Sequence, residues 1–339
     1  MAMQVGVIGC GYWGPNLIRN IAAHPEMKVQ AIADLRRERL NLIARQYPTI
    51  TRCSADAGEV IRAPEIDAVV IATPVSSHFA LAMDALEAGK HVFLEKPFTA
   101  TVEQAERLIE TAERKNLRLF VDHTFLYTGA VQTIKRLVDG GELGELYYFD
   151  SVRVNLGLFQ HAVNVIWDLA AHDVSIMDYL LGRDPRAISA TGVAHFDRDL
   201  ENIAYVTTFY DHNLLGHIHV NWLAPVKVRK TLLSGSKKMV IYDDMEPSEK
   251  VKVYDRGIDF VRDKDQIYNI LIEYRTGDMW APKVELTEAL RKVTAEFYNA
   301  VNENRAPMTD GRAGLRVVRI LEAANKSIMV RYSGVVPDT

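Results

Sequence analysis

The sequence of 339 residues has little cysteine and no large excess of charge of either sign. Two cysteines, Cys10 and Cys53, are too few for a disulfide framework, which favours a reducing compartment such as the cytoplasm. The formal net charge of −4 gives no electrostatic reason to expect binding to nucleic acid or to an anionic membrane surface. Both classes of partner are therefore excluded from our expectations.

Long hydrophobic runs, internal repeats and low-complexity segments are also missing. Because no apolar run reaches about 18 residues, the sequence predicts no membrane span. The first residues enter a strand pattern without a basic segment, so we expect no signal peptide. The whole sequence is 48% hydrophobic and 25% charged, which is typical of globular proteins with full cores. Its length predicts two domains.

Strand and helix patterns alternate through the first third of the chain. Apolar strand-like runs are followed by amphipathic helical stretches, joined by short links. The predicted strands are residues 4–8, 29–33, 68–72, 91–94 and 117–121, and the predicted helices are residues 14–23, 37–46, 77–88 and 102–115. This alternation predicts an N-terminal Rossmann domain, a doubly wound parallel sheet in an α/β protein, over residues 1–122.

Residues 123–339 follow a different sequence pattern, with long runs that alternate between polar and apolar residues. His217 and His219 fall on one face of such a strand, whereas Val220 and Trp222 fall on the other. The runs are residues 145–155, 187–195, 204–210, 214–223, 228–233 and 238–242, with helical patterns at 130–139, 167–181, 285–301 and 311–330. They predict a C-terminal α+β domain with an open, mostly antiparallel sheet. Its apolar residues such as Val220 and Trp222 would pack on a partner, so we expect a homodimer or homotetramer.

A glycine-rich turn follows the first predicted strand. Gly9-Cys10-Gly11-Tyr12-Trp13-Gly14 fits the pattern G-x-G-x-x-G and opens a predicted helix. The first glycine permits the tight turn, the second lets a pyrophosphate approach the backbone, and the third lets the helix pack on the strand. The helix N-terminus offers free N–H groups and a partial positive charge to the phosphates. This turn predicts a bound dinucleotide, with Tyr12 and Trp13 beside it; a structural turn in which Trp13 only packs is the alternative.

Asp34 ends the second predicted strand, about 20 residues beyond Gly14, where a carboxylate can accept hydrogen bonds from the adenosine ribose. A carboxylate at this position repels a 2′-phosphate, so we expect NAD as the cofactor. Arg36 and Arg37 follow closely and could tolerate NADP, which is the less favoured alternative.

A lysine follows the strand at residues 91–94, in the sequence Glu95-Lys96-Pro97. Open α/β sheets bind ligands at the carboxyl ends of their strands. Lys96 there can hydrogen-bond a reacting oxygen and stabilise its developing negative charge, while Pro97 keeps Lys96 in extended backbone conformations. A solvated surface lysine is the alternative.

The preceding strand ends in Ala72-Thr73-Pro74, which we expect near the central phosphates and ribose of the cofactor. His78 follows on the next predicted helix. It is either a further cofactor contact or a structural histidine at a helix end.

Asp168 and His172 lie four residues apart on a predicted helix and so share one helical face. A carboxylate beside an imidazole holds its tautomer and raises its basicity, as a general acid/base histidine requires. His161 adds another polar group in this region. The alternative is a helix cap with a core histidine, and a zinc site lacks a third nearby ligand of suitable spacing, so we expect no metal.

These features together resemble the Gfo/Idh/MocA family (glucose–fructose oxidoreductase, inositol dehydrogenase and MocA), over nearly the whole chain. The family pairs a Rossmann domain with a C-terminal open-sheet domain. Its marks are a G-x-G-x-x-G loop, an E-K-P after the fifth strand, and a D-x-x-x-H on a helix of the second domain. The resemblance implies that Lys96 and His172 are the catalytic pair and that Asp168 is their neighbour in the substrate pocket.

The sequence also resembles one subgroup in particular. The segments GYWGPNLIRN, HTFLYTGAV and NLGLFQ…WDLAAHD resemble a subgroup met among sugar-nucleotide enzymes, some of which oxidise the 3-hydroxyl of a UDP-N-acetylhexosamine. Many family members have a glycine-rich stretch before the D-x-x-x-H. This chain has Asn164-Val165-Ile166-Trp167 there, which leaves the shape of the pocket open.

The resemblance implies reversible NAD-dependent oxidation of a secondary sugar hydroxyl. His172 would take the hydroxyl proton with Asp168 orienting it, and Lys96 would hold the oxygen while a hydride passes to the nicotinamide. We expect this site in the cleft between the domains. Further substrate-side candidates come from the domain junction and the first long strand: His123, Phe125, Tyr127, Arg153, Asn155 and Asn164. Arg153 would clamp a diphosphate or form a salt bridge on the sheet face.

Three other functions fit parts of the pattern. The first is a ketoreductase or a dehydrogenase of a free polyol such as inositol. The second is a non-catalytic NAD-binding sensor, against which the presence of both Lys96 and His172 argues. The third, a hydrolase that uses bound NAD as a redox cofactor, is the weakest.

Overall fold

The computed structural model describes residues 2–157, 163–196, 200–262 and 270–330. By its internal contacts the chain divides into two units. Unit 1 comprises Met1–Tyr127 and Thr287–Glu322, and unit 2 comprises Thr128–Leu286 and Ala323–Thr339. The predicted division into residues 1–122 and 123–339 was continuous, and it differs from these units because part of the C-terminal region returns to unit 1.

The returning segment packs through aromatic side chains. Helix α8 (Ala289–Asn302) contacts α1 (Gly14–Ala22), and its Phe297 ring lies edge-on to Phe93 and Phe120, with centroids 5.5 and 5.8 Å apart. Aromatic pairs of this geometry bury large apolar area. Such long-range packing has no local signal in the sequence.

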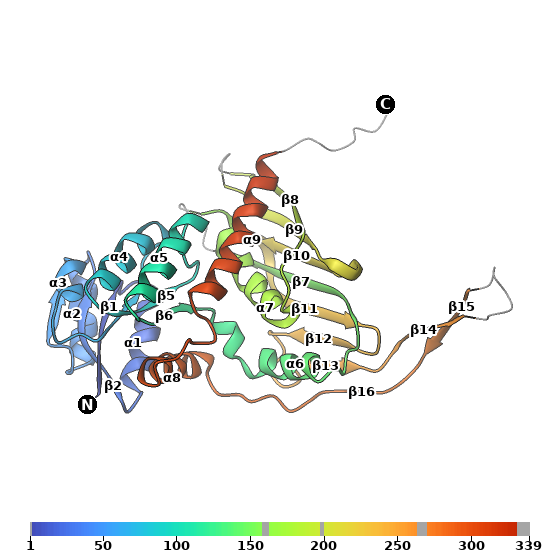
Figure 1. Cartoon of the computed structure of the whole chain (residues 1–339), viewed down its shortest axis with the longest axis horizontal. Coiled ribbons are helices and arrows are strands. Elements are labelled where there is room, and N and C mark those ends of the chain that lie inside the picture. Colours follow the sequence, from blue (N-terminus) through green and yellow to red (C-terminus); the bar gives the residue numbers. More distant parts are fainter. Residues whose placement is uncertain (1, 158–162, 197–199, 263–269, 331–339) are drawn as a thin grey trace. The chain divides into compact units, whose positions relative to one another are not determined.

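Unit 1 contains a six-stranded parallel sheet with the order β3-β2-β1-β4-β5-β6. Figure 1 labels β1, β2, β5 and β6 of this sheet and shows helices beside it. Its order reverses between β1 and β4, as in doubly wound folds. The strands are β1 (Met3–Ile8), β2 (Met27–Ala33), β3 (Arg52–Ser54), β4 (Ala68–Ile71), β5 (His91–Glu95) and β6 (Leu119–Asp122). The intervening helices are α1, α2 (Arg37–Gln46), α3 (Ala57–Ile61), α4 (Val75–Glu87) and α5 (Val102–Arg114). The predicted Rossmann fold is confirmed.

Local sequence explains these elements. All four residues of β4 are fully buried, as expected for a central parallel strand covered by helices on both faces. Thr101 caps α5 by accepting a hydrogen bond from the Gln104 N–H at 3.2 Å. Gly89 follows α4 at φ +77°, a left-handed conformation that favours glycine.

Unit 2 contains an eight-stranded sheet with the order β16-β13-β12-β11-β7-β10-β9-β8. Only β7 and β10 pair in parallel, and the other neighbouring pairs are antiparallel, which confirms the predicted fold class. The strands are β7 (Leu146–Leu156), β8 (Ala187–Val193), β9 (Ile203–Phe209), β10 (Leu215–Asn221), β11 (Leu223–Gly235), β12 (Met239–Asp243), β13 (Val251–Tyr254) and β16 (Met279–Trp280). Strands β14 (Gly257–Arg262) and β15 (Ile270–Arg275) form a separate antiparallel pair.

Helices α6 (Gly129–Asp139) and α7 (Ala171–Leu181) belong to unit 2, and a π-helical turn at Ile166–Ala170 leads into α7. Helix α9 (Gly311–Met329) contributes residues to both units. Within the described residues, no helix combines the length and the apolar character needed to span a bilayer.

The two faces of the eight-stranded sheet differ in burial. Val220 and Trp222 are 0% and 1% exposed, and the π-helical turn and α7 pack against β10 on their side. Tyr205 and His219 lie on the opposite face, where their rings stack at 4.4 Å. The expectation that Val220 and Trp222 cover a partner is therefore wrong, because the chain's own helices already bury them.

Candidate active site

The glycine loop between β1 and α1 excludes side chains at two of its three glycines. Gly9 has φ +95°, and a Cβ on it would lie 2.5 Å from the Ala72 carbonyl oxygen. A Cβ on Gly14 would lie 2.1 Å from the Gly9 carbonyl oxygen. Beside Gly11 the nearest such atom is the flexible Arg39 Nη1, at 3.2 Å. The loop thus brings bare backbone to the start of α1 and keeps Gly11 open, which fits a pyrophosphate.

Asp34, directly after β2, faces the same loop. Its Oδ2 accepts a hydrogen bond from the Cys10 N–H at 2.7 Å, and its Oδ1 accepts one from the Arg36 N–H at 2.8 Å. Arg39 Nη1 lies 3.9 Å from Oδ2. These contacts fix the carboxylate beside the loop, where its remaining lone pairs can accept from ribose hydroxyls. The residues present therefore fit a dinucleotide.

Other predicted cofactor residues lie around this loop in unit 1. Tyr12 is 86% exposed, whereas Trp13 is half-buried and its indole favours the charged form of Asp122. Thr73 and Pro74 follow β4 and lead into α4. Gly9 packs against Ala72, so the structure brings the ends of β1 and β4 together.

His78 on α4 joins two loops. Its Nε2 lies 2.8 Å from the Thr73 carbonyl oxygen and its Nδ1 lies 2.9 Å from the Pro97 carbonyl oxygen, and the ring is 1% exposed. Burial lowers the pKa of His78, and the two carbonyl oxygens oppose that shift by accepting hydrogen bonds. This geometry supports the structural role, in which His78 holds the Lys96-Pro97 segment against the end of β4.

Lys96 follows β5 directly and is half-buried, with a cis peptide bond to Pro97. It lies at the carboxyl edge of the parallel sheet, where the sequence predicted it. Burial raises the pKa of Glu95 and of Asp122, and the positive charge of Lys96 opposes that rise. At His123 the same charge adds to burial in lowering the pKa. The structure thus gathers several ionisable groups around the predicted catalytic lysine.

Asp122, the last residue of β6, was not predicted as a site residue. It pairs in register with Glu95 across the two parallel strands, and each carboxyl group influences the pKa of the other. Burial raises the pKa of both residues, that of Glu95 well above its usual range. A sequence signal was available, since Asp122 directly follows the apolar strand that neighbours the one carrying Glu95.

The predicted substrate residues after β6 lie in unit 1. His123 is 1% exposed, and neither ring nitrogen has a hydrogen-bond partner among the described residues. Burial, with the charges of Lys96 and Arg316, lowers its pKa to about 3. Phe125 is half-buried in the 3₁₀ turn Thr124–Tyr127, and the Tyr127 hydroxyl lies 3.0 Å from Thr309 Oγ1.

Asp168 and His172 lie in unit 2 where two helical forms meet. Asp168 belongs to the π-helical turn, and His172 lies in the first turn of α7; both are half-buried. Asp168 Oδ2 accepts a hydrogen bond from Trp222 Nε1 at 3.1 Å. Trp222 had been predicted only as an apolar sheet residue, because a contact between β10 and a distant helix has no local signal.

The residue after His172 fixes this helix to the sheet. Asp173 Oδ2 lies 2.5 Å from Arg153 Nε, and Ser151 donates to Asp173 Oδ1 at 2.6 Å. Arg153 and Asp173 are 3% and 2% exposed. Arg153 therefore forms the sheet-face salt bridge of its two predicted roles, and that bridge holds α7 against β7.

Asn164 precedes the π-helical turn and is 5% exposed. Its Nδ2 donates to Glu201 Oε2 at 2.8 Å and to Asn325 Oδ1 at 2.9 Å. Asn155 is half-buried near the end of β7. His161 lies outside the described residues.

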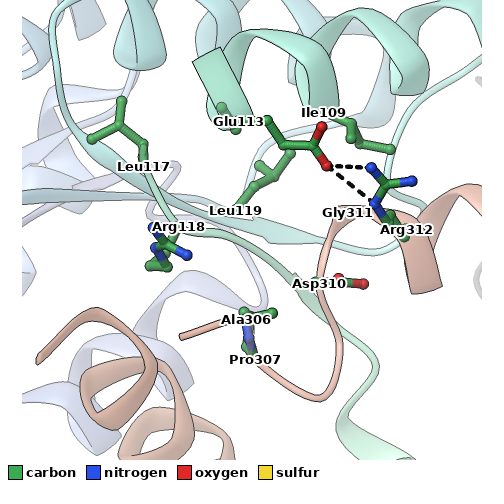
Figure 2. Close-up of a pocket in the computed structure, with 11 residues that line it drawn as sticks. Ile109, Glu113, Leu117, Arg118, Leu119, Ala306, Pro307, Asp310, Gly311 and Arg312 are labelled. Atoms are coloured by element: carbon green, nitrogen blue, oxygen red, sulfur yellow. Dashed lines mark hydrogen bonds and ion pairs between the residues drawn. The ribbon is translucent and has the colours of Figure 1, made fainter. Parts of the chain in front are cut away.

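A pocket of about 190 Å³ opens elsewhere in unit 1, between α5, the start of β6 and the segment before α9 (Figure 2). In Figure 2, Glu113 and Arg312 point toward each other, and two hydrogen bonds of 2.6 and 3.1 Å join them. This pocket lies at the opposite end of β6 from Asp122 and contains none of the predicted site residues. Within the described residues, no cluster of three or more His, Cys, Asp or Glu side chains is arranged to hold a metal.

Comparison with known proteins agrees with this geometry. Residues 3–123 match the model of the GFO/IDH/MocA oxidoreductase family with an NAD-binding Rossmann fold, and residues 131–241 match the family's C-terminal domain. The chain belongs to this family. It is an NAD-binding oxidoreductase, and the resemblance and the NAD cofactor class predicted from the sequence are confirmed.

Curated relatives span almost the whole chain. The UDP-N-acetylglucosamine 3-dehydrogenase of Acidithiobacillus ferrooxidans is 27% identical over 93% of this chain and 94% of its own length. The myo-inositol 2-dehydrogenase of Thermotoga maritima is 24% identical, with 98% of each chain covered. Among solved structures, a levoglucosan dehydrogenase in complex with NADH superposes with a TM-score of 0.82 at 20% identity, covering 97% of each chain. The last comparison shows the fold alone.

Proposed function

We propose that the chain is an NAD-dependent dehydrogenase that oxidises a secondary hydroxyl of a sugar nucleotide, with C3 of a UDP-N-acetylhexosamine as the substrate position. The observation that carries this proposal is the near-complete match to UDP-N-acetylglucosamine 3-dehydrogenase. The match covers 93% of this chain, so it extends through the C-terminal domain as well as the NAD-binding domain. The placement of Lys96 at the carboxyl edge of β5 supports it further.

The proposed mechanism uses two catalytic side chains, those of His172 and Lys96. His172 takes the proton of the substrate hydroxyl, and Asp168, held by Trp222 Nε1, orients the imidazole. Lys96 donates a hydrogen bond to the same oxygen and stabilises the negative charge that develops on it. NAD⁺, when bound along the glycine loop and Asp34, supplies the hydride acceptor. The alcohol thus loses a proton and a hydride and becomes a ketone.

The experiment measures NADH formation from UDP-N-acetylglucosamine and NAD⁺. Lys96→Ala and His172→Ala should each lower the rate by about 10²-fold or more, because each removes a group that acts on the reacting oxygen. Lys115→Ala and His212→Asn, both away from the strand ends and helix that carry the site, are matched controls and should keep the rate. Wild-type-like rates in both catalytic variants would contradict the assignment and favour an NAD-binding sensor.

A second substrate class, free polyols, is favoured by the match to myo-inositol 2-dehydrogenase. Parallel assays with myo-inositol and with free N-acetylglucosamine separate the two classes. Turnover of myo-inositol without any need for the UDP group would replace the sugar-nucleotide proposal. Calorimetry with NAD and NADP tests the role of Asp34, and tighter binding of NADP would overturn the preference for NAD.

We further propose a reducing cytoplasmic location and a homo-oligomer. Cys10 is buried and Cys53 exposed, and both are free thiols. Oligomerisation would use the exposed face of β9 and β10 rather than the helix-covered one. Tyr205, Phe209 and Leu215 on that face are 42%, 42% and 37% exposed.

A further inference from the structure

Two acidic side chains meet inside unit 1 at the strand ends next to Lys96. Glu95 and Asp122 are 8% and 1% exposed and pair in register as the last residues of β5 and β6. Two ionised carboxylates that lie side by side and away from water repel each other strongly. The arrangement therefore needs a compensating group between them.

The hydrogen bonds of the four oxygens identify that group. Glu95 Oε2 accepts from the Lys96 N–H at 3.2 Å, and Asp122 Oδ1 accepts from Thr124 Oγ1 at 2.6 Å. Glu95 Oε1 and Asp122 Oδ2 are buried, and no described N–H or O–H group donates to either with normal geometry. Carboxylate oxygens only accept hydrogen bonds, so these two oxygens satisfy each other only when one carries a proton.

Few charged groups act on the carboxyl groups of Glu95 and Asp122. Lys96 is the cation that acts on both carboxyl groups, and the Trp13 indole acts on Asp122. His123 is neutral at physiological pH because burial, with the charges of Lys96 and Arg316, lowers its pKa to about 3. Burial raises the pKa of the Tyr127 phenol, and the charge of Asp122 adds to this rise, so the phenol is neutral. Burial lowers the pKa of His78 on α4, and the charge of Lys96 adds to this effect.

We propose that Glu95 and Asp122 share one proton, and that the single negative charge left on the pair positions the Lys96 ammonium group. The inference rests on the proposed function, in which Lys96 binds the substrate oxygen. Glu95 and Asp122 are then positioning residues that act through Lys96. A pair with two charges would repel itself, whereas a pair with one charge avoids that repulsion and still attracts the half-buried Lys96 ammonium.

The shared proton is tested by infrared spectroscopy of the full-length protein at pH 7. A protonated carboxyl group gives a carbonyl band that ionised carboxylates lack. The band should be present in the wild type and absent from Glu95→Gln and from Asp122→Asn, because each amide supplies the N–H that replaces the proton. Glu201→Gln, at a buried carboxylate that accepts from Asn164, is the matched control and should keep the band. A wild type without the band, or single variants that keep it, would overturn the shared proton.

The charge on Lys96 is tested by its acetylation with acetic anhydride at increasing pH, with Lys115 as the internal reference. Each single amide variant keeps one negative charge and should leave the reactivity within about twofold of wild type. The double variant Glu95→Gln/Asp122→Asn is isosteric but neutral, so Lys96 should react about tenfold faster at the same pH, because the nearby negative charge that favours its unreactive ammonium form is gone. Unchanged reactivity in the folded double variant would overturn the positioning role.

Neither readout depends on the substrate. If Lys96→Ala retains NADH formation, the proposed function fails while the infrared band and the acetylation profile keep their expected values. If hydride transfer requires Lys96 but the band is missing, only the present inference fails.

Discussion

Asp122 and His123 are neighbours in the chain, and burial moves their pKa values in opposite directions. Burial disfavours any charged form, so it raises the pKa of the Asp122 carboxyl and lowers that of the His123 imidazole. At the scale of single residues, burial therefore works against the charged form of both groups beside the lysine that we propose as catalytic.

His123 should make the folded state sensitive to acid. Its pKa is about 3 when folded and about 6.5 when unfolded, so between these values the unfolded chain binds the proton more readily. The stabilisation is complete above about pH 6.5 and declines as the pH falls toward 3. At pH 5 the loss should be about 2 kcal/mol relative to pH 7, measured as the free energy of unfolding in urea. His123→Asn should lose this part of the pH dependence.

The matched control for that experiment is His212→Asn, since His212 is exposed in a turn with φ +58°, which asparagine tolerates. The control variant should keep the wild-type difference between pH 5 and pH 7. An equally acid-sensitive His123→Asn variant would show that the imidazole titrates normally in the folded chain.

At the scale of elements, the glycine loop separates packing from ligand access. Gly14→Ala places a methyl group 2.1 Å from the Gly9 carbonyl oxygen, so α1 must shift. We expect its melting temperature to fall by about 5 °C or more. At Gly11 only the far end of the Arg39 side chain is near, so Gly11→Ala should keep its melting temperature and weaken NAD binding about tenfold. Thermal unfolding and calorimetry on both variants test this, and equal melting temperatures would contradict it.

The buried ion pair between β7 and α7 predicts a large effect on stability. Asp173→Asn leaves the Arg153 guanidinium without its carboxylate at a site 3% exposed. Removing one partner of a buried pair typically costs about 3–5 kcal/mol in the free energy of unfolding. The control is Asp211→Asn, which breaks the exposed pair with Arg186 and should cost at most about 1 kcal/mol in urea titrations. Similar losses in both variants would mean that burial does not strengthen the Arg153–Asp173 pair.

Patterns in the sequence predicted the long elements and the site residues that lie at their ends. Periodicity located most strands and helices of unit 1, but β3 and α3 are only three and five residues long and were missed. The alternation along β10 separated two faces correctly, yet it could not tell which face the helices cover. Asp122 was missed for a similar reason, since its importance comes from the register of β6 against β5.

At the scale of the whole molecule, the exposed sheet face of unit 2 is the surface where we expect copies of the chain to meet. On β9 and β10, Tyr205 stacks on His219, and Phe209 is paired in register with Leu215. Side chains of this kind gain free energy when a second apolar surface covers them, by about 25 cal/mol for each Å² of apolar area buried. The opposite face, with Val220 and Trp222, is already covered.

Tyr205→Glu tests this surface, because the substitution places a charge on the exposed face, next to His219. We expect light scattering to show a multiple of the chain mass for the wild type and a smaller assembly for the variant, since an unpaired charge is costly in a buried interface. Leu42→Glu, at a side chain 61% exposed on α2, is the control and should leave the mass unchanged. A monomeric wild type would contradict the homo-oligomer itself. An oligomer unaffected by Tyr205→Glu would instead place the interface on another face of the chain.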